Sequence, residues 1–153
     1  MRIFYSTMLV FCLILSSCSG FKTVKATSSI PNGTEVSYSK VMNPAFAKDY
    51  IGADVITEVE FYAPNASNMW QTKVPKNHIV FQVIPVDGSA KSSPLGGGQL
   101  GDYVFIPKDK GEIVFDLKSG DKIKLRGGTR VRKGIIAGNV EIVEFIATSI
   151  TKI

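Results

Sequence analysis

An alternation of apolar and polar side chains over Asp54–Tyr62 constrains the fold of this chain more than any other feature. Glu58 and Glu60 share one face of the segment DVITEVEFY. The opposite face carries Val55, Thr57, Val59 and Phe61. A repeat of two residues is typical of a β-strand that is buried on one side and faces water on the other. The segment therefore predicts a half-buried strand.

Further segments that predict strands continue through the rest of the 153 residues. They are residues 78–86, 103–106, 112–117, 121–126, 130–137 and 140–149. In the first of these, Ile79, Phe81 and Val83 share one face. About seven short strands with this spacing are typical of a small β-barrel or a β-sandwich.

One short helix is expected over Val41–Tyr50, with Asn43 as its N-cap, Pro44 in its first turn and Gly52 after its end. This segment, about five main strands, and the stretch GDKIKLRGG, a strand that leads into a glycine turn, resemble the OB-fold. The expected fold is therefore mainly β. It is a single small β-barrel of OB-like type or a sandwich, with at most one short helix.

The segment DKIKLRGGTRVRKG, residues 121–134, is rich in basic side chains. They are Lys122, Lys124, Arg126, Arg130, Arg132 and Lys133. A three-residue loop at Gly127–Thr129 would place Leu125 opposite Val131 and Arg126 opposite Arg130. In that register the apolar residues face the core and the bases face solvent, so the segment predicts a cationic β-hairpin.

Two interpretations of this predicted hairpin are open. Lys122, Lys124, Arg126, Arg130 and Arg132 are candidates for binding phosphates, acidic glycans or lipid headgroups. Alternatively, the bases form a solvated strand face that prevents pairing between sheet edges. Like charges opposite one another are unfavourable unless anions or nearby acids neutralise them.

The N-terminus begins with Arg2 and an apolar run, Ile3–Leu15, which is too short to span a bilayer as a helix. The residues that follow, Leu15-Ser16-Ser17-Cys18, resemble the lipobox of bacterial lipoproteins. The resemblance implies that the thiol of Cys18 takes a diacylglyceryl group and that the chain is cut before it. The new amine can also be acylated. Several acyl chains on one residue would anchor the protein firmly to a membrane.

This resemblance divides the chain into a signal peptide at 1–17, a lipidated N-terminus with a flexible tether at 18–40, and a β-barrel domain at 41–153. Cys12 would leave with the signal peptide and Cys18 would be blocked, so the mature protein is expected to have neither a disulfide nor a free thiol. Ser19, in place of aspartate, resembles the sorting pattern of enteric outer-membrane lipoproteins. It indicates the outer membrane of a bacterial envelope in preference to the inner.

The sequence offers little for catalysis. His78 is the only histidine, which excludes sites built from several histidines, and no serine lies in a G-x-S-x-G turn. Glu58 and Glu60 are expected to be a solvated strand face. We therefore predict a protein that is not an enzyme and that uses no cofactor or metal.

The partners suggested by the sequence are the membrane and an envelope component. The formal charge of +5, or +4 without Arg2, is only modestly basic. Nucleic acid is not expected as a partner, because the export signal separates it from the domain and the aromatic strand residues are core positions. Trp70, in the polar loop 63–77, either contacts a partner or covers an end of the barrel.

The leading hypothesis is a membrane-anchored lipoprotein whose barrel is a binding or assembly module. Its partner would be an anionic envelope polymer or another envelope protein, with the basic hairpin as a candidate contact. A surface-exposed adhesin for host polyanions and an envelope hydrolase are the alternatives.

Overall fold

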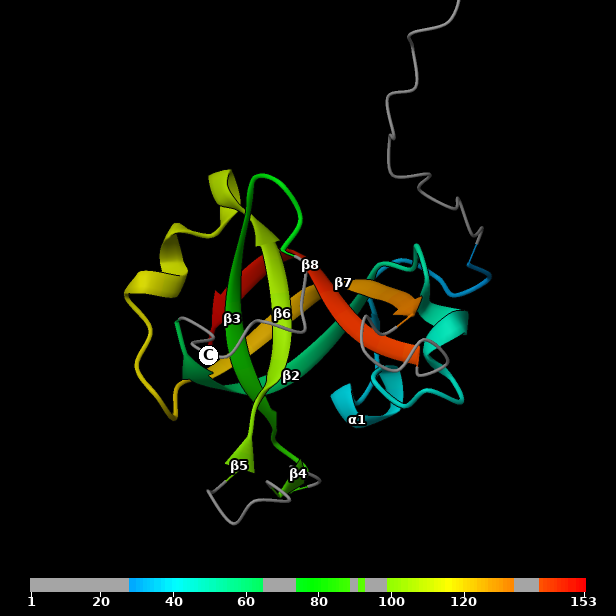
Figure 1. The fold of residues 1–153 in the computed structure, drawn as a ribbon, viewed down its shortest axis with the longest axis horizontal. Helices are drawn as coiled ribbons and strands as arrows, with labels where there is room; N and C mark the ends of the chain where they lie inside the picture. Colours follow the sequence, from blue (N-terminus) through cyan, green and yellow to red (C-terminus); the bar gives the residue numbers. More distant parts are fainter. Residues whose placement is uncertain (1–27, 65–73, 89–90, 93–98, 134–140) are drawn as a thin grey trace, which may run out of the picture.

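The computed structural model describes residues 28–64, 74–88, 91–92, 99–133 and 141–153. Its five long strands form one barrel (Figure 1). They are β2 (Val55–Ala63), β3 (His78–Pro85), β6 (Asp102–Pro107), β7 (Lys122–Lys133) and β8 (Glu141–Lys152). The shorter elements are β1 (Thr34–Glu35), α1 (Tyr38–Val41), β4 (Lys91–Ser92), β5 (Gln99–Leu100) and the 3₁₀ turns η1 (Ala47–Tyr50), η3 (Lys108–Lys110) and η4 (Glu112–Phe115).

The barrel closes through the pairing of β2 with β7. Strands β2, β3 and β6 pair antiparallel in sequence order, β6 then pairs parallel with β8, and β8 pairs antiparallel with β7. The antiparallel pairing of β7 with β2, from Val55↔Gly127 to Glu60↔Lys122, completes the ring. A sandwich would keep two separate sheets, so of the two expected architectures the small β-barrel is confirmed.

The core follows the predicted period of two. The four residues assigned to the inner face of β2 are all buried, and Glu58 and Glu60 are half-buried on the outer face. On β3, Phe81 and Val83 are fully buried, and Ile79 packs against the core at its edge. Alternation therefore identified both strands and the faces that fill the barrel.

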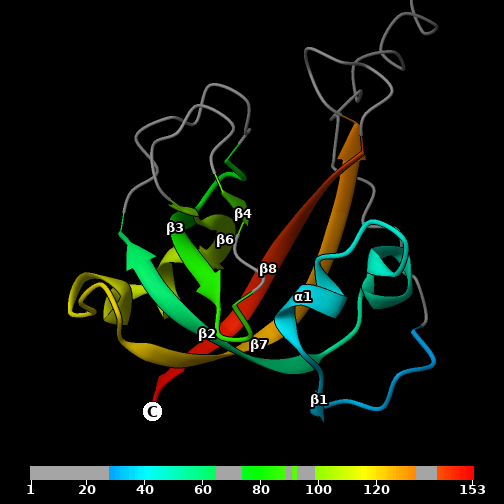
Figure 2. The same cartoon turned by 90° about the horizontal axis from the view of Figure 1, so that it is seen from below.

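The packed structure reaches further toward the N-terminus than the expected boundary at Val41. Ile30 and Val36 pack against the core, β1 pairs parallel with the start of β2, and Tyr38 is only 2% exposed. The ring of Tyr38 lies 6.0 Å from that of Phe145. Residues 30–38, which the sequence assigned to a tether, thus cover one side of the barrel (Figure 2).

The helix expected over Val41–Tyr50 is wrong. The chain forms α1 before Pro44 and η1 after it, with a turn between them. Asn43 is not a helix N-cap, because η1 begins after Phe46; its Oδ1 instead accepts a hydrogen bond from the Ala45 N–H at 2.9 Å, within the turn between the two helices. A proline disfavours helical geometry at the residue before it, so the helix ends ahead of Asn43.

The strand expected over Glu112–Leu117 is also wrong, because η4 occupies Glu112–Phe115. Val114 and Leu117 reach the core, and Phe115 is 65% exposed. Every strand of the closed barrel already has two neighbours, which leaves no edge for this segment to join. Its apolar side chains cover an end of the barrel as a turn.

The predicted basic hairpin is not formed either. Residues 122–133 are one continuous strand, β7, which pairs with β8 along its whole length and runs beside it in Figure 2. Gly127 and Gly128 are sites of close backbone approach. A Cβ on Gly127 would lie 2.1 Å from the Ile146 carbonyl oxygen, and one on Gly128 would lie 2.4 Å from that of Ala53. The glycines therefore admit neighbouring backbones and do not turn the chain.

Candidate functional site

On the neighbouring strands, the residues that pair with the basic residues of β7 are acidic or neutral, and none is basic. Lys124 lies between Glu58 of β2 and Thr151 of β8, and its Nζ is 3.1 Å from Glu35 Oε1. Lys122 is exposed and lies opposite Glu60. The opposition of Arg126 to Arg130, which the hairpin required, does not occur, so the repulsion it implied is absent.

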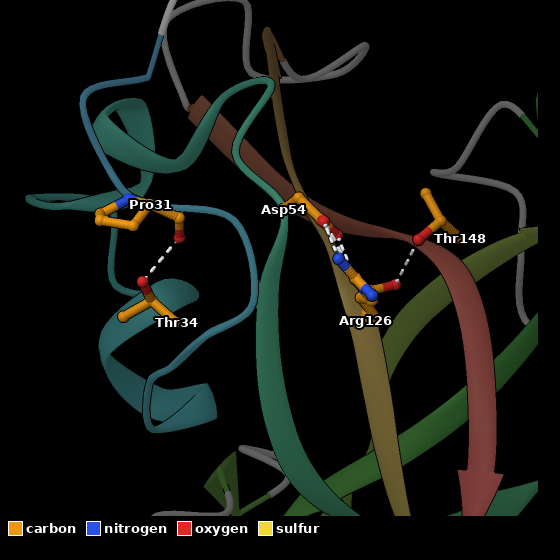
Figure 3. A network of polar contacts seen from close by, with 5 residues as sticks. All are labelled: Pro31, Thr34, Asp54, Arg126 and Thr148. Atoms are coloured by element: carbon orange, nitrogen blue, oxygen red, sulfur yellow. Dashed lines mark hydrogen bonds and ion pairs between the residues drawn. The ribbon is translucent and has the colours of Figure 1, made fainter.

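Two nitrogens of the Arg126 guanidinium group donate hydrogen bonds to the carboxylate of Asp54 (Figure 3). Its Nε lies 2.8 Å from Oδ1 and its Nη2 lies 2.5 Å from Oδ2. The hydrogen bond from Arg126 holds the pKa of Asp54 below its usual range, and the same contact raises the pKa of Arg126. Thr148 Oγ1 donates to the Arg126 carbonyl, which ties the pair to β8. This guanidinium is therefore engaged within the protein.

Arg130 and Arg132 converge on Glu144 of β8, which is 2% exposed. Arg130 donates from Nε to Oε2 at 2.7 Å and also contacts that oxygen through Nη2. Arg132 Nε donates to Oε1 at 2.8 Å. The Arg130 guanidinium lies 5.4 Å from the centre of the buried Phe105 ring. A buried carboxylate needs such partners, so this cluster has a structural role.

A groove of about 270 Å³ opens beside the middle of β2, between its pairing with β1 and its pairing with β3. β1 pairs with β2 only at Val55 and Ile56, and β3 joins it from Val59 onward. We call this space the β1–β3 groove. Its lining residues are Glu35, Val36, Ser37, Tyr38, Ile56, Thr57, Glu58, Pro85, Val86, Asp87 and Lys124. Three acids against one lysine give its walls a negative charge.

Two buried hydroxyl groups belong to residues that line the β1–β3 groove. Tyr38 Oη and Thr57 Oγ1 have no hydrogen-bond partner within the part of the chain that the structure describes. Burial raises the pKa of Tyr38 well above its usual value, and the charge of Asp102 adds to the effect. Buried hydroxyls are normally paired, so these two are exceptions, although both are buried behind the groove wall and Thr57 belongs to the inner face of β2.

The candidate catalytic residues are not brought together. His78 is at the opposite end of β3 from the residue that faces Glu60, a separation of roughly 20 Å along the strand. Its Nδ1 lies 3.0 Å from the Lys76 carbonyl oxygen. Among the described residues, no group of three histidines, cysteines or acids could hold a metal ion.

Two predicted site residues, Cys18 and Trp70, lie outside the described residues. Within the described ranges, no helix has the length and apolar character needed to cross a membrane. Tyr103 is half-buried, and Phe61, Phe81 and Phe105 are buried, so these aromatics do not form a stacking platform for bases.

The counter-ions Asp54 and Glu144 were missed from the sequence. Asp54 was seen only as the start of a strand. One signal for Glu144 was present in the sequence. It lies three residues after Glu141, and side chains three apart on a strand point to opposite faces of the sheet, so the two acids could not share one face.

No protein-family model matches this sequence, and no curated protein sequence matches it.

Proposed function

We propose that the protein is a bacterial lipoprotein, held in the cell envelope by acyl chains on Cys18, whose barrel is a binding or assembly module. The observation that carries the anchor is the sequence Leu15-Ser16-Ser17-Cys18 after an apolar run. The outer membrane is the proposed location, because Ser19 follows the cysteine. Mass spectrometry of the N-terminal peptide tests this. An N-terminus at an acylated Cys18 is expected, and an unmodified Cys18 within a longer peptide would refute it.

The β1–β3 groove is the proposed binding position. Its carboxylates, Glu35, Glu58 and Asp87, favour a partner that presents a cationic or hydrogen-bond-donating group. Lys124 lies beside Glu35 and Ser39 donates to Asp87, and both contacts are exposed to solvent, so a bound group would compete with them. The partner is thus expected to be another envelope protein that inserts a basic side chain.

A pull-down from solubilised envelopes tests the groove. The full-length protein is compared with a Glu58→Gln, Asp87→Asn variant and with Glu112→Gln, a control in which an exposed acid of η4 is neutralised. We expect the groove variant to lose partners that the control retains. Identical recovery from all three proteins would exclude the groove as the contact.

The structure gives less support than the sequence did for an anionic partner that binds the basic residues of Lys122–Lys133. Four of its five candidate bases contact carboxylates of the same chain. An adhesin for polyanions depends on the same bases and loses support for the same reason. A hydrolase would need Glu58, Glu60 and His78 at one site, which their strand positions do not allow.

A further inference from the structure

The described chain begins beside η1. Ser28 Oγ donates to the carbonyl oxygen of Asp49 at 3.3 Å, and the first described residues run along this side of the molecule (Figure 1). A shallow hollow of about 480 Å³ lies here. It is lined by Ser28, Ser29, Ile30, Lys40, Phe46, Lys48, Asp49 and Tyr50.

The position of Ser28 limits how far this side can be from the proposed anchor. Nine residues separate Cys18 from Ser28. A fully extended chain advances at most about 3.6 Å per residue, so Ser28 lies within about 35 Å of Cys18 in any conformation. The side of the barrel around η1 is therefore held within reach of the bilayer.

The side chains here are of the kind found at membrane surfaces. Phe46 is a large apolar residue that is 45% exposed, and Lys40 and the Lys48 side chain are exposed around it. Aromatic rings and lysines are typical of proteins that lie on headgroups, because the ring enters the interface and the ammonium group meets phosphate. We call Lys40, Phe46 and Lys48 the N-terminal face.

The charge near this face is modestly positive. Asp49 offsets one lysine, and Glu141 forms an exposed ion pair with Lys48 at 2.7 Å. The connecting stretch 19–27 adds Lys22 and Lys25 and contains no acid. On the described face the two lysines balance the two acids, so the net charge of +2 is that of Lys22 and Lys25 in the stretch that joins this face to Cys18, and it favours an anionic lipid surface over a neutral one.

We propose that the N-terminal face lies against the headgroups of anionic phospholipids in the membrane that holds Cys18. The proposal rests on the anchor proposed above and adds an orientation to it. Phe46 enters the interface, and the opposite end of the barrel points away from the membrane. That end carries η4 and the C-terminus, which lie far from η1 in both Figure 1 and Figure 2.

Fluorescence quenching tests this orientation. The full-length lipidated protein is placed in vesicles of phosphatidylcholine and phosphatidylglycerol that contain lipids brominated on their acyl chains. Trp70→Phe removes the native tryptophan, and Phe46→Trp then supplies a single probe on the N-terminal face. Phe115→Trp is the matched control, because Phe115 is also exposed but belongs to η4.

We expect the Phe46→Trp variant to be quenched at least threefold more than the Phe115→Trp variant. Equal quenching, in protein that still floats with the vesicles, overturns the orientation and leaves the anchor standing. Failure to float overturns the anchor and this proposal together.

A second measurement covers the case in which Phe46→Trp does not fold. Acylated Cys18 leaves no free thiol in the mature chain, so Lys40→Cys can carry a spin label, with Lys110→Cys on η3 as the control. A label that is protected from water-soluble relaxation agents at position 40, and exposed at 110, supports the proposal. Equal accessibility at both positions refutes it.

Discussion

Replacing Glu144 by glutamine removes the one buried charge that holds two arginines. The Glu144 side chain is 2% exposed, and the side chains of Arg130 and Arg132 are 26% and 18% exposed. In the Glu144→Gln variant these guanidinium groups would remain largely buried without a negative partner. Breaking a fully buried ion pair costs about 3–5 kcal/mol. The partial exposure of both arginines reduces the expected loss to about 3 kcal/mol.

Unfolding in urea, followed by circular dichroism, measures this loss. A domain of this size has an unfolding entropy of about 0.26 kcal/mol/K, so the same change lowers the Tm by about 12 °C. Glu141→Gln is the control on the same strand. Glu141 is 42% exposed and pairs with the exposed Lys48, so its loss should cost less than about 1 kcal/mol.

A Glu144→Gln variant as stable as Glu141→Gln would refute this reasoning. It would mean that water or other groups satisfy Arg130 and Arg132 without the carboxylate. A Glu144→Asp variant separates the effect of the negative charge from the effect of side-chain length, because it keeps the charge and shortens the side chain. We expect it to be intermediate in stability.

Three further predictions follow from single contacts. Gly128→Ala places a Cβ 2.4 Å from the Ala53 carbonyl oxygen, so we expect a loss above about 3 kcal/mol in the same urea assay, and a near-neutral effect would contradict the close approach. Tyr38→Phe removes a buried hydroxyl without a described partner, so stability should stay within about 1 kcal/mol of wild type; a larger loss would reveal a hidden hydrogen bond. The pKa of Asp54 is lowered in the folded state, so its contribution is present above about pH 4 and lost as the pH falls further. Asp54→Asn should therefore flatten the acid limb of a stability–pH profile, and an unchanged limb would assign acid sensitivity to other groups.

The sequence predicted the barrel strands where one face was continuously apolar. Val55 to Phe61 on β2 and Phe81 to Val83 on β3 alternate, and burial on one side of a sheet requires that pattern. Glu112–Leu117 is also short and largely apolar, but a strand needs an open edge to join, and closure is a property of the whole barrel. Local pattern alone could not exclude it.

Gly127 and Gly128 misled the sequence interpretation for a similar reason. Two adjacent glycines between alternating segments favour a turn, and also favour a place where backbones pass closely. The choice depends on Ala53 and Ile146, which are distant in sequence. The basic side chains were correctly placed on an outer face as far as Arg126, but their carboxylate partners lie in β1, just before β2, and in β8. Composition showed the charges, whereas their neutralisation depended on the topology.

The pairing of β2 with β7 has a consequence for folding kinetics. Val55 and Gly127 are partners although 72 positions separate them along the chain (127 − 55). Contacts of such long range are slow to form, because a large loop must close before they contribute. A nascent chain that ends before β7 can therefore form hairpins but not the barrel. The segment that closes the ring is thus among the last to arrive, whether the chain folds during synthesis or after the export proposed above.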